Sequence, residues 1–245
     1  MRPLSVQEMI SVWERGEWHS PLDRALLLLQ AGQPASSLQE LARLTVGERD
    51  RRLIELREQT IGRRLSCSVE CPWCGEVLEF EFDTSQILQA PATLHTEPIH
   101  VSADGFSAAC RLPTSEDLME VLRSSASPGE SRRRLLARCV LELQKDGQVV
   151  EFDRAPETID STLCNLIGSS DAQADIQFSV QCLSCGKSWQ ATFDVTSFFW
   201  KEIAVRARRA LSEVHVLAGS YGWKESDILG MSPARREFYL DMVSA

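Results

Sequence analysis

The sequence predicts an α+β protein, and three observations lead to this fold class. Both ends of the chain, residues 1–62 and 197–245, show helix caps and apolar residues at helical spacing. Two short segments, residues 63–86 and 175–196, change to an apolar period of two, which is typical of β-hairpins with one buried face. Each of these segments also carries a CxxC motif, so we expect the two hairpins to be copies of one unit.

The composition indicates a folded chain without a membrane span or an export signal. The chain has 245 residues, 43% of them hydrophobic, which is enough for a substantial core. No window reaches the roughly 18 to 20 continuous apolar residues of a membrane helix, and acidic residues interrupt the first 20 positions. We therefore expect synthesis in the cytoplasm, where cysteines stay reduced or bind metal. The net charge of −9 argues against a general affinity for nucleic acid.

The N-terminal helical region, residues 1–62, has clear helix start signals. Ser5, Ser20 and Thr45 each precede a predicted helix, with an acidic residue three positions further on. The expected helix ends are Gly16, Gly32 and Gly62. We interpret the arginines of the last helix as part of a solvent-exposed face balanced by acidic neighbours. This predicted face comprises Arg49, Arg52 and Arg57 beside Glu48, Asp50, Glu55 and Glu58.

The first cysteine-containing hairpin is predicted within residues 63–86. Leu65, Cys67 and Val69 alternate with polar residues, residues 71–75 form a turn, and the alternation resumes after it. The segment therefore reads as a hairpin with one buried face.

Residues 87–174 are predicted to form an inserted α+β segment. Asp-Gly pairs at residues 104–105 and 146–147 mark the turns of two hairpins. The expected helix starts are Thr114, Pro128 and Pro156.

A shift of 111 positions places the second hairpin on the first. Cys182 and Cys185 then fall on Cys71 and Cys74, and the apolar positions on both sides of the turn also coincide. Two copies of one zinc knuckle explain this agreement most simply. The second knuckle occupies residues 175–196.

The four cysteines of the repeat predict one structural zinc ion. Each CxxC motif offers two thiolates, which fill half of a tetrahedral shell, and the second copy completes it. The predicted ligands are Cys71, Cys74, Cys182 and Cys185. Because four thiolates leave no position for water or substrate, we expect the Zn²⁺ ion to hold the fold rather than to catalyse a reaction. Iron fits the same kind of cage, so the metal type stays open.

The remaining cysteines are predicted to be core thiols. Cys67 corresponds to Phe178 in the repeat, and Cys110, Cys139 and Cys164 occupy apolar positions of predicted elements. Two alternatives to a zinc site are a redox-active CxxC motif and a disulfide framework. A redox-active CxxC motif lies at the start of a helix, whereas both motifs of this chain lead into strands. The sequence has no nucleophile motif and no phosphate loop, so we expect no enzyme activity.

The C-terminal helical tail, residues 197–245, is predicted to contain one long helix and two short ones. Gly219 and Gly222 are expected to end the long helix. The predicted helices are residues 198–218, 224–229 and 233–243. Aromatic residues are concentrated in this tail, and aromatic side chains are enriched at interface hot spots. Tyr221 and Trp223 are therefore the candidate partner-binding residues.

Seven motifs along the chain carry a resemblance to a known family. They are Ser11-Val-Trp-Glu-Arg-Gly16, Pro21-Leu-Asp-Arg-Ala25, Leu44-Thr-Val-Gly-Glu-Arg-Asp50, Cys71-Pro-Trp-Cys-Gly75, Arg111-Leu-Pro-Thr114, Cys182-Leu-Ser-Cys-Gly186 and Tyr221-Gly-Trp-Lys-Glu-Ser-Asp-Ile-Leu229. In this order they resemble small zinc-ribbon baseplate proteins of contractile-tailed phages and of phage-derived contractile injection systems. The resemblance covers nearly the whole chain.

This resemblance implies a non-catalytic role in the baseplate hub, or in assembling that hub. The implied partners are other hub proteins, the spike or the tape measure protein. The implied locations are the bacterial cytoplasm during assembly and the baseplate of the virion or injection system afterwards. One alternative is a chaperone of the tape measure protein that leaves before assembly is complete. Another is a zinc-ribbon regulator that binds nucleic acid, which the glutamates around the first knuckle disfavour.

Overall fold

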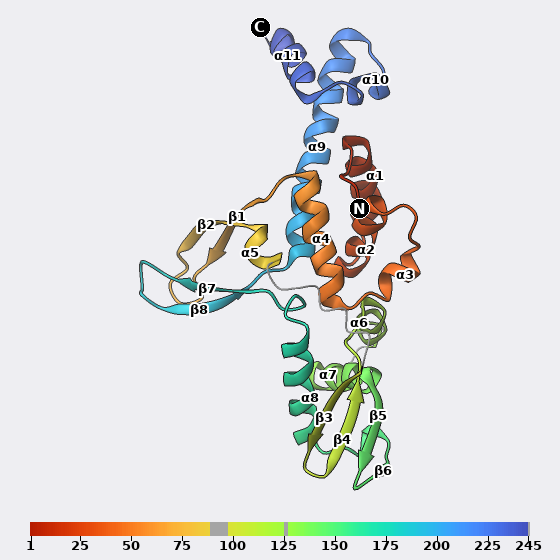
Figure 1. The fold of residues 1–245 in the computed structure, drawn as a ribbon. Coiled ribbons are helices and arrows are strands. Elements are labelled where there is room, and N and C mark those ends of the chain that lie inside the picture. Colours follow the sequence, from red (N-terminus) through yellow and green to blue (C-terminus); the bar gives the residue numbers. More distant parts are fainter. Residues whose placement is uncertain (89–97, 125–126, 245) are drawn as a thin grey trace.

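The protein combines helices with small antiparallel sheets, as predicted for the fold class (Figure 1). The computed structural model describes residues 1–88, 98–124 and 127–244. Three parts extend in different directions from a helical body: a two-hairpin arm, the inserted segment and a C-terminal head (Figure 1). None of the described helices is long and apolar enough to cross a membrane.

The body begins with four helices whose starts are fixed by capping side chains. They are α1 (Val6–Gly16), α2 (Pro21–Gly32), α3 (Leu38–Ala42) and α4 (Val46–Thr60). Ser5, Ser20 and Thr45 each accept a hydrogen bond from the backbone amide three residues on, which confirms the predicted starts of α1, α2 and α4. The sequence analysis missed α3, although Ser37 and Glu40 form a complete capping box there.

The long helix α9 (Val195–Tyr221) completes the core of the body. Phe199 and Ile203 are fully buried against leucines of α2 and α4, among them Leu28 and Leu53. Gly219 does not end this helix, contrary to the prediction; the helix continues to Tyr221. Gly222 caps it in the left-handed conformation, at φ +68°, which glycine adopts at little cost.

The prediction that the arginines of α4 form a solvent-exposed face is wrong for two of the three. Arg57 is only 3% exposed and makes a bidentate ion pair with Glu202 of α9, at 2.7 and 2.9 Å. Arg49 is 6% exposed, pairs with Asp50 at 2.7 Å and donates to the Ser115 hydroxyl at 3.2 Å. These partners lie on other elements or are buried themselves, so α4 uses this face to join the body to α9 and to the inserted segment.

The arm consists of two hairpins that match one another residue for residue. Their strands are β1 (Arg64–Glu70), β2 (Val77–Asp83), β7 (Gln177–Gln181) and β8 (Ser188–Thr192). Cys67 pairs with Phe80 in the first hairpin, and Phe178 pairs with Ala191 in the second, so the shift of 111 positions preserves the register. The short helix α5 (Thr84–Leu88), which was not predicted, follows β2.

Aromatic side chains fill the space between the two hairpins near the body. Phe82 contacts Phe178 with ring centroids 4.5 Å apart and Phe193 at 5.4 Å, and Phe80 lies 6.2 Å from Phe178. Rings at these separations add to the stability gained from apolar burial. The alternating apolar residues of the sequence therefore face one another across the arm.

The inserted segment is a four-stranded antiparallel sheet with helices packed on it. The sheet order is β3-β4-β5-β6. Its elements are β3 (Ile99–Ala103), β4 (Phe106–Cys110), α6 (Ser115–Leu122), α7 (Pro128–Cys139), β5 (Val140–Lys145), β6 (Gln148–Val149), η1 (Phe152–Arg154) and α8 (Glu157–Ser170). Both predicted Asp-Gly turns and all three predicted helix starts are confirmed. Residues 89–97, at the start of the predicted insertion, lie outside the described residues.

The inserted segment contacts the body at the start of α4. The Val46 amide donates to the Pro113 carbonyl at 3.0 Å, and the Gly47 amide donates to the Asp171 carboxylate at 2.9 Å. An acidic side chain is favourable at a helix N-terminus because the free amides there carry positive partial charge. The loop before α6 and the residue after α8 are therefore both held at the start of α4.

The head contains the end of α9 with α10 (Glu225–Leu229) and α11 (Pro233–Ser244). Ile228 and Leu217 are fully buried between these helices. The two short helices agree with the prediction to within a few residues.

Candidate metal centre

The structure brings the sulfur atoms of Cys71, Cys74, Cys182 and Cys185 together at the tip of the arm. All four lie within 4.8 Å of one another. The shortest separations are 3.7 Å between Cys71 and Cys185 and 3.6 Å between Cys74 and Cys182. A tetrahedron of thiolates about 2.3 Å from a zinc ion has sulfur atoms about 3.8 Å apart. The cluster therefore has the dimensions of a four-thiolate metal site.

Identical turns aim the sulfur atoms inward in the two knuckles. The Cys71 amide donates to the Glu76 carbonyl at 2.8 Å, and the Gly75 amide donates to the Cys71 carbonyl at 3.0 Å. The same two bonds recur 111 positions later, each at 2.9 Å. Gly75 and Gly186 have φ values of +74° and +72°, where a side chain would strain the backbone. The glycine after each second cysteine therefore allows the chain to turn back into the next strand.

Hydrogen bonds within the cluster shift the pKa values of two of its thiols in opposite directions. Desolvation opposes ionisation of Cys71, but hydrogen bonds from the Trp73 and Cys74 amides lower its pKa to about 7. The Glu76 amide favours the Cys74 thiolate, but hydrogen bonds with the neighbouring thiols raise its pKa to about 12. A bound cation would displace the thiol protons and stabilise all four thiolates.

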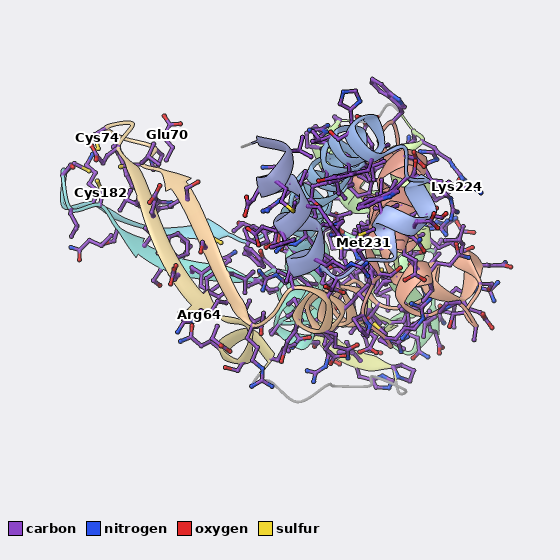
Figure 2. The ribbon with its side chains drawn as sticks, turned by 90° about the horizontal axis from the view of Figure 1, so that it is seen from above. Arg64, Glu70, Cys74, Cys182, Lys224 and Met231 are labelled. Atoms are coloured by element: carbon purple, nitrogen blue, oxygen red, sulfur yellow. The ribbon has the colours of Figure 1, made fainter. Side chains whose placement is uncertain are left out.

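The tip of the arm exposes apolar side chains around this cluster. Figure 2 shows Cys74 and Cys182 at the far end of the arm, away from the body. Trp73 is 49% exposed and meets Trp189 edge to face at 5.7 Å, and Leu183 is 93% exposed. Sequence reasoning did not single out Trp73 or Leu183, although an apolar residue inside a CxxC turn is a visible signal.

The other cysteines lie outside the cluster. Cys110 and Cys139 are 0% and 1% exposed, which confirms their prediction as core thiols. Cys67 and Cys164 are half-buried rather than buried, and desolvation raises the pKa of each thiol. All eight cysteines are free of disulfides.

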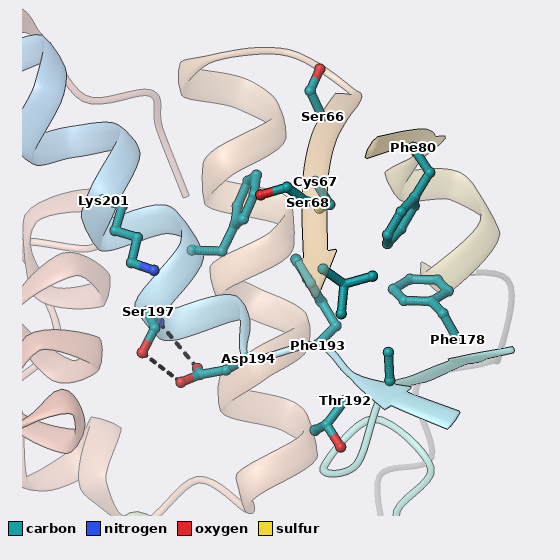
Figure 3. Close-up of a pocket in the computed structure, with 13 residues that line it drawn as sticks. Ser66, Cys67, Ser68, Phe80, Phe178, Thr192, Phe193, Asp194, Ser197 and Lys201 are labelled. Atoms are coloured by element: carbon teal, nitrogen blue, oxygen red, sulfur yellow. Dashed lines mark hydrogen bonds between the residues drawn. The ribbon is translucent and has the colours of Figure 1, made fainter. Parts of the chain in front are cut away.

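A cavity of about 330 Å³ lies at the base of the arm, between β1 and the start of α9 (Figure 3). Phe80, Phe178 and Phe193 supply its apolar wall. Its polar groups serve the helix: Asp194 accepts hydrogen bonds from the Ser197 amide at 3.1 Å and from the Ser197 hydroxyl at 2.5 Å. Asp194 therefore caps α9.

Tyr221 and Trp223, the sequence-predicted partner residues, lie in the head, far from the cysteine cluster (Figure 1). Their rings stack at 4.5 Å, and Trp223 meets Tyr239 edge to face at 4.8 Å. Tyr221 remains 37% exposed, whereas Trp223 is half-buried. The pair therefore helps to hold the head together and leaves one ring edge at the surface.

One family of known proteins matches the chain. The family described as T4 bacteriophage base plate protein matches residues 33–200, a region that contains both knuckles and the whole inserted segment. Searches of curated proteins and of solved structures gave no significant match. Because the match covers more than half of the sequence, the chain belongs to the T4 bacteriophage base plate protein family.

Proposed function

We propose that this chain is a non-catalytic structural component of the baseplate hub of a contractile phage tail or of a phage-derived contractile injection system. The observation that supports this most is the family match over residues 33–200, which includes all four cysteines of the tip cluster. The match supports a structural role in a phage baseplate. The hub assignment is our extension of it, based on the order of motifs along the chain.

We further propose that Cys71, Cys74, Cys182 and Cys185 bind one structural zinc ion. The separations of the sulfur atoms and the two identical turns support this ligand set. The ion would link two hairpins between which residues 75–181 form a loop of about 107 residues. Closing so long a loop removes much of the conformational entropy of the unfolded chain. The metal would therefore hold the two hairpins together at the tip of the arm without taking part in a reaction.

The head supplies the proposed contact with hub, spike or tape measure proteins. Besides Tyr221, it exposes Phe238 (63%) and Met242 (57%) on successive turns of α11. Three apolar side chains together at one end of the molecule are typical of an interface and unusual for a surface that faces only water.

The test is the stoichiometry of the chain in assembled particles. Particles purified from cells that express a tagged chain should contain it at a fixed ratio to the other baseplate proteins. Presence in assembly intermediates and loss from finished particles would instead favour the chaperone alternative. Absence from both would overturn the proposal.

Variants test whether the head makes the contact. Tyr221→Ala and Phe238→Ser should each reduce incorporation into particles, because each removes exposed apolar surface. Trp18→Ala is the matched control, since Trp18 is 91% exposed and lies outside the head, just after the end of α1. Equal incorporation of all three variants would exclude the head as the contact surface.

A further inference from the structure

The arm carries a face that combines negative charge with an exposed apolar side chain. In β2 the side chains that point away from the second hairpin include Glu79 and Glu81, and the turn adds Glu76. None of these carboxylates has an ion-pair partner in the part of the chain that the structure describes. We call the following set the arm face: Glu70, Glu76, Val77, Glu79 and Glu81.

Helix α9 carries a flank of the opposite sign. Positions four or three residues apart share one side of a helix, and such a series runs along α9 from Lys201 to Val216. Every member is exposed, with Val205 at 64% and Val216 at 37%. We call the following set the α9 flank: Lys201, Val205, Arg208, Arg209, Ser212 and Val216.

The cations of this flank are only weakly engaged. Arg208 lies 3.4 Å from Glu17, and Arg209 pairs with Glu213 on the same helix at 3.1 Å. The side chains of both arginines are more than 60% exposed, and exposed ion pairs of this kind contribute little free energy. The flank therefore presents three exposed cations, two of them in exposed ion pairs, in a chain whose net charge is −9.

The two surfaces also match in length. The flank runs over 16 residues of helix, from Lys201 to Val216, about 22 Å at 1.5 Å rise per residue. Each strand of the first hairpin has seven residues, about 23 Å when extended. The arm and the upper part of α9 leave the body in different directions (Figure 1).

We propose that the arm face docks on the α9 flank of a second copy of this chain. The opposite charges set the pairing, and the exposed Val77 on one side meets Val205 on the other. A single contact of this length buries less surface than the roughly 1,200 Å² of a stable complex. We therefore expect self-association that is weak and sensitive to salt. The proposal does not depend on the baseplate role, because purified protein is sufficient to test it.

The experiment is sedimentation velocity over a concentration series at low salt, repeated at about 0.5 M salt. The wild type should self-associate at low salt and dissociate at high salt. The arm variant Glu79→Lys/Glu81→Lys should be monomeric at both. A monomeric arm variant would show that the arm face itself makes the contact. The variant is less negatively charged than the wild type, and a smaller net charge by itself favours association.

Charge exchange makes the test specific. The flank variant Arg208→Glu/Arg209→Glu should also be monomeric alone. An equal mixture of the arm and flank variants should associate again, because the two reversed surfaces have opposite charges and the two unchanged surfaces also meet. The control variant is Glu151→Lys/Glu157→Lys, at two exposed positions of the inserted segment. It changes the net charge as much as the arm variant does, and we expect it to associate like the wild type.

Three results would overturn the proposal. The first is a wild type that stays monomeric at low salt up to about 200 μM, a concentration at which contacts of this size class are populated. The second is self-association that the arm and flank variants leave unchanged. The third is a mixture of the two variants that stays monomeric. Circular dichroism on each variant checks that it is folded.

Discussion

At the residue scale, the role of each cysteine follows from its place in the repeat. Cys67 stands four positions before Cys71 and resembles a ligand by spacing alone, but its counterpart in the second knuckle is Phe178. The structure places Cys67 outside the sulfur cluster, on the wall of the cavity at the base of the arm. An internal repeat thus separated the candidate ligands from the other thiols without any other sequence for comparison.

The arginines of α4 show where reasoning from one helix fails. Acidic residues surround Arg57 in the sequence, so a solvated face was the simplest expectation. Its actual partner, Glu202, is 145 positions away, on a helix that reaches α4 only in the folded chain. The Arg57 guanidinium also lies 6.0 Å from the centre of the Phe198 ring. Local charge patterns carry no information about such a pair.

Removing one member of this ion pair should destabilise the protein strongly. We expect Arg57→Ala to lower the free energy of unfolding by about 3 kcal/mol, because Glu202 is left with no partner in a poorly solvated place. Arg52→Ala is the matched control: Arg52 pairs with Glu48 on the same helix, partly exposed, and should cost less than about 1 kcal/mol. Urea denaturation measures both; equal losses would contradict the account.

At the element scale, helix starts were predictable and helix ends less so. Ser, Thr and Pro caps act through contacts within four residues, so the sequence contains the whole signal. Gly219 was taken as a helix end, but glycine inside a helix costs only about 1 kcal/mol, and the packing of Leu217 against Ile228 continues past it. The short helices α3 and α5 lack the length that makes an apolar period visible.

The junction between α4 and the inserted segment gives a prediction at this scale. A methyl group on Gly47 would lie 1.7 Å from an Asp171 carboxylate oxygen, so Gly47→Ala must displace Asp171. We expect a loss of about 1 to 2 kcal/mol of stability in the wild type. In an Asp171→Ala background the same change should be neutral or stabilising, since alanine is the better helix former.

A double-mutant cycle over these two positions measures the coupling. We expect at least about 1 kcal/mol of interaction energy between residues 124 positions apart in sequence. Additive effects would show that Asp171 does not hold the insertion on α4.

At the scale of the whole molecule, the arrangement of the parts was not predictable. The repeat indicates that two hairpins meet, but the direction in which the arm leaves the body depends on contacts between residues far apart in sequence (Figure 1). Two features connect the arm to the body. One is the ring contacts among Phe82, Phe178 and Phe193, and the other is the buried start of α9 at Val195. The sequence showed these residues as apolar without showing what they face.

Metal removal should act on one part of the molecule first. We expect a chelator to raise amide hydrogen exchange in β1, β2, β7 and β8 by more than about tenfold, because the tip cluster has few apolar contacts to replace the metal. The leucine-rich core of α2 and α4 should keep its protection, since its side chains are buried independently of the arm. Unchanged exchange in the arm would show that the hairpins hold together without metal.

We propose that the four cysteines of the tip cluster bind one metal ion that joins the two knuckles. Native mass spectrometry with metal analysis tests it most directly, on wild type, Cys182→Ser and the control Cys67→Ser. We predict one zinc ion per chain in the wild type and in Cys67→Ser. In Cys182→Ser we predict no zinc and an unfolding midpoint lower by roughly 8 to 16 °C, as for about 4 kcal/mol lost from a loop of this length. Metal-free wild type from reducing conditions, with Cys182→Ser equally stable, would contradict the account.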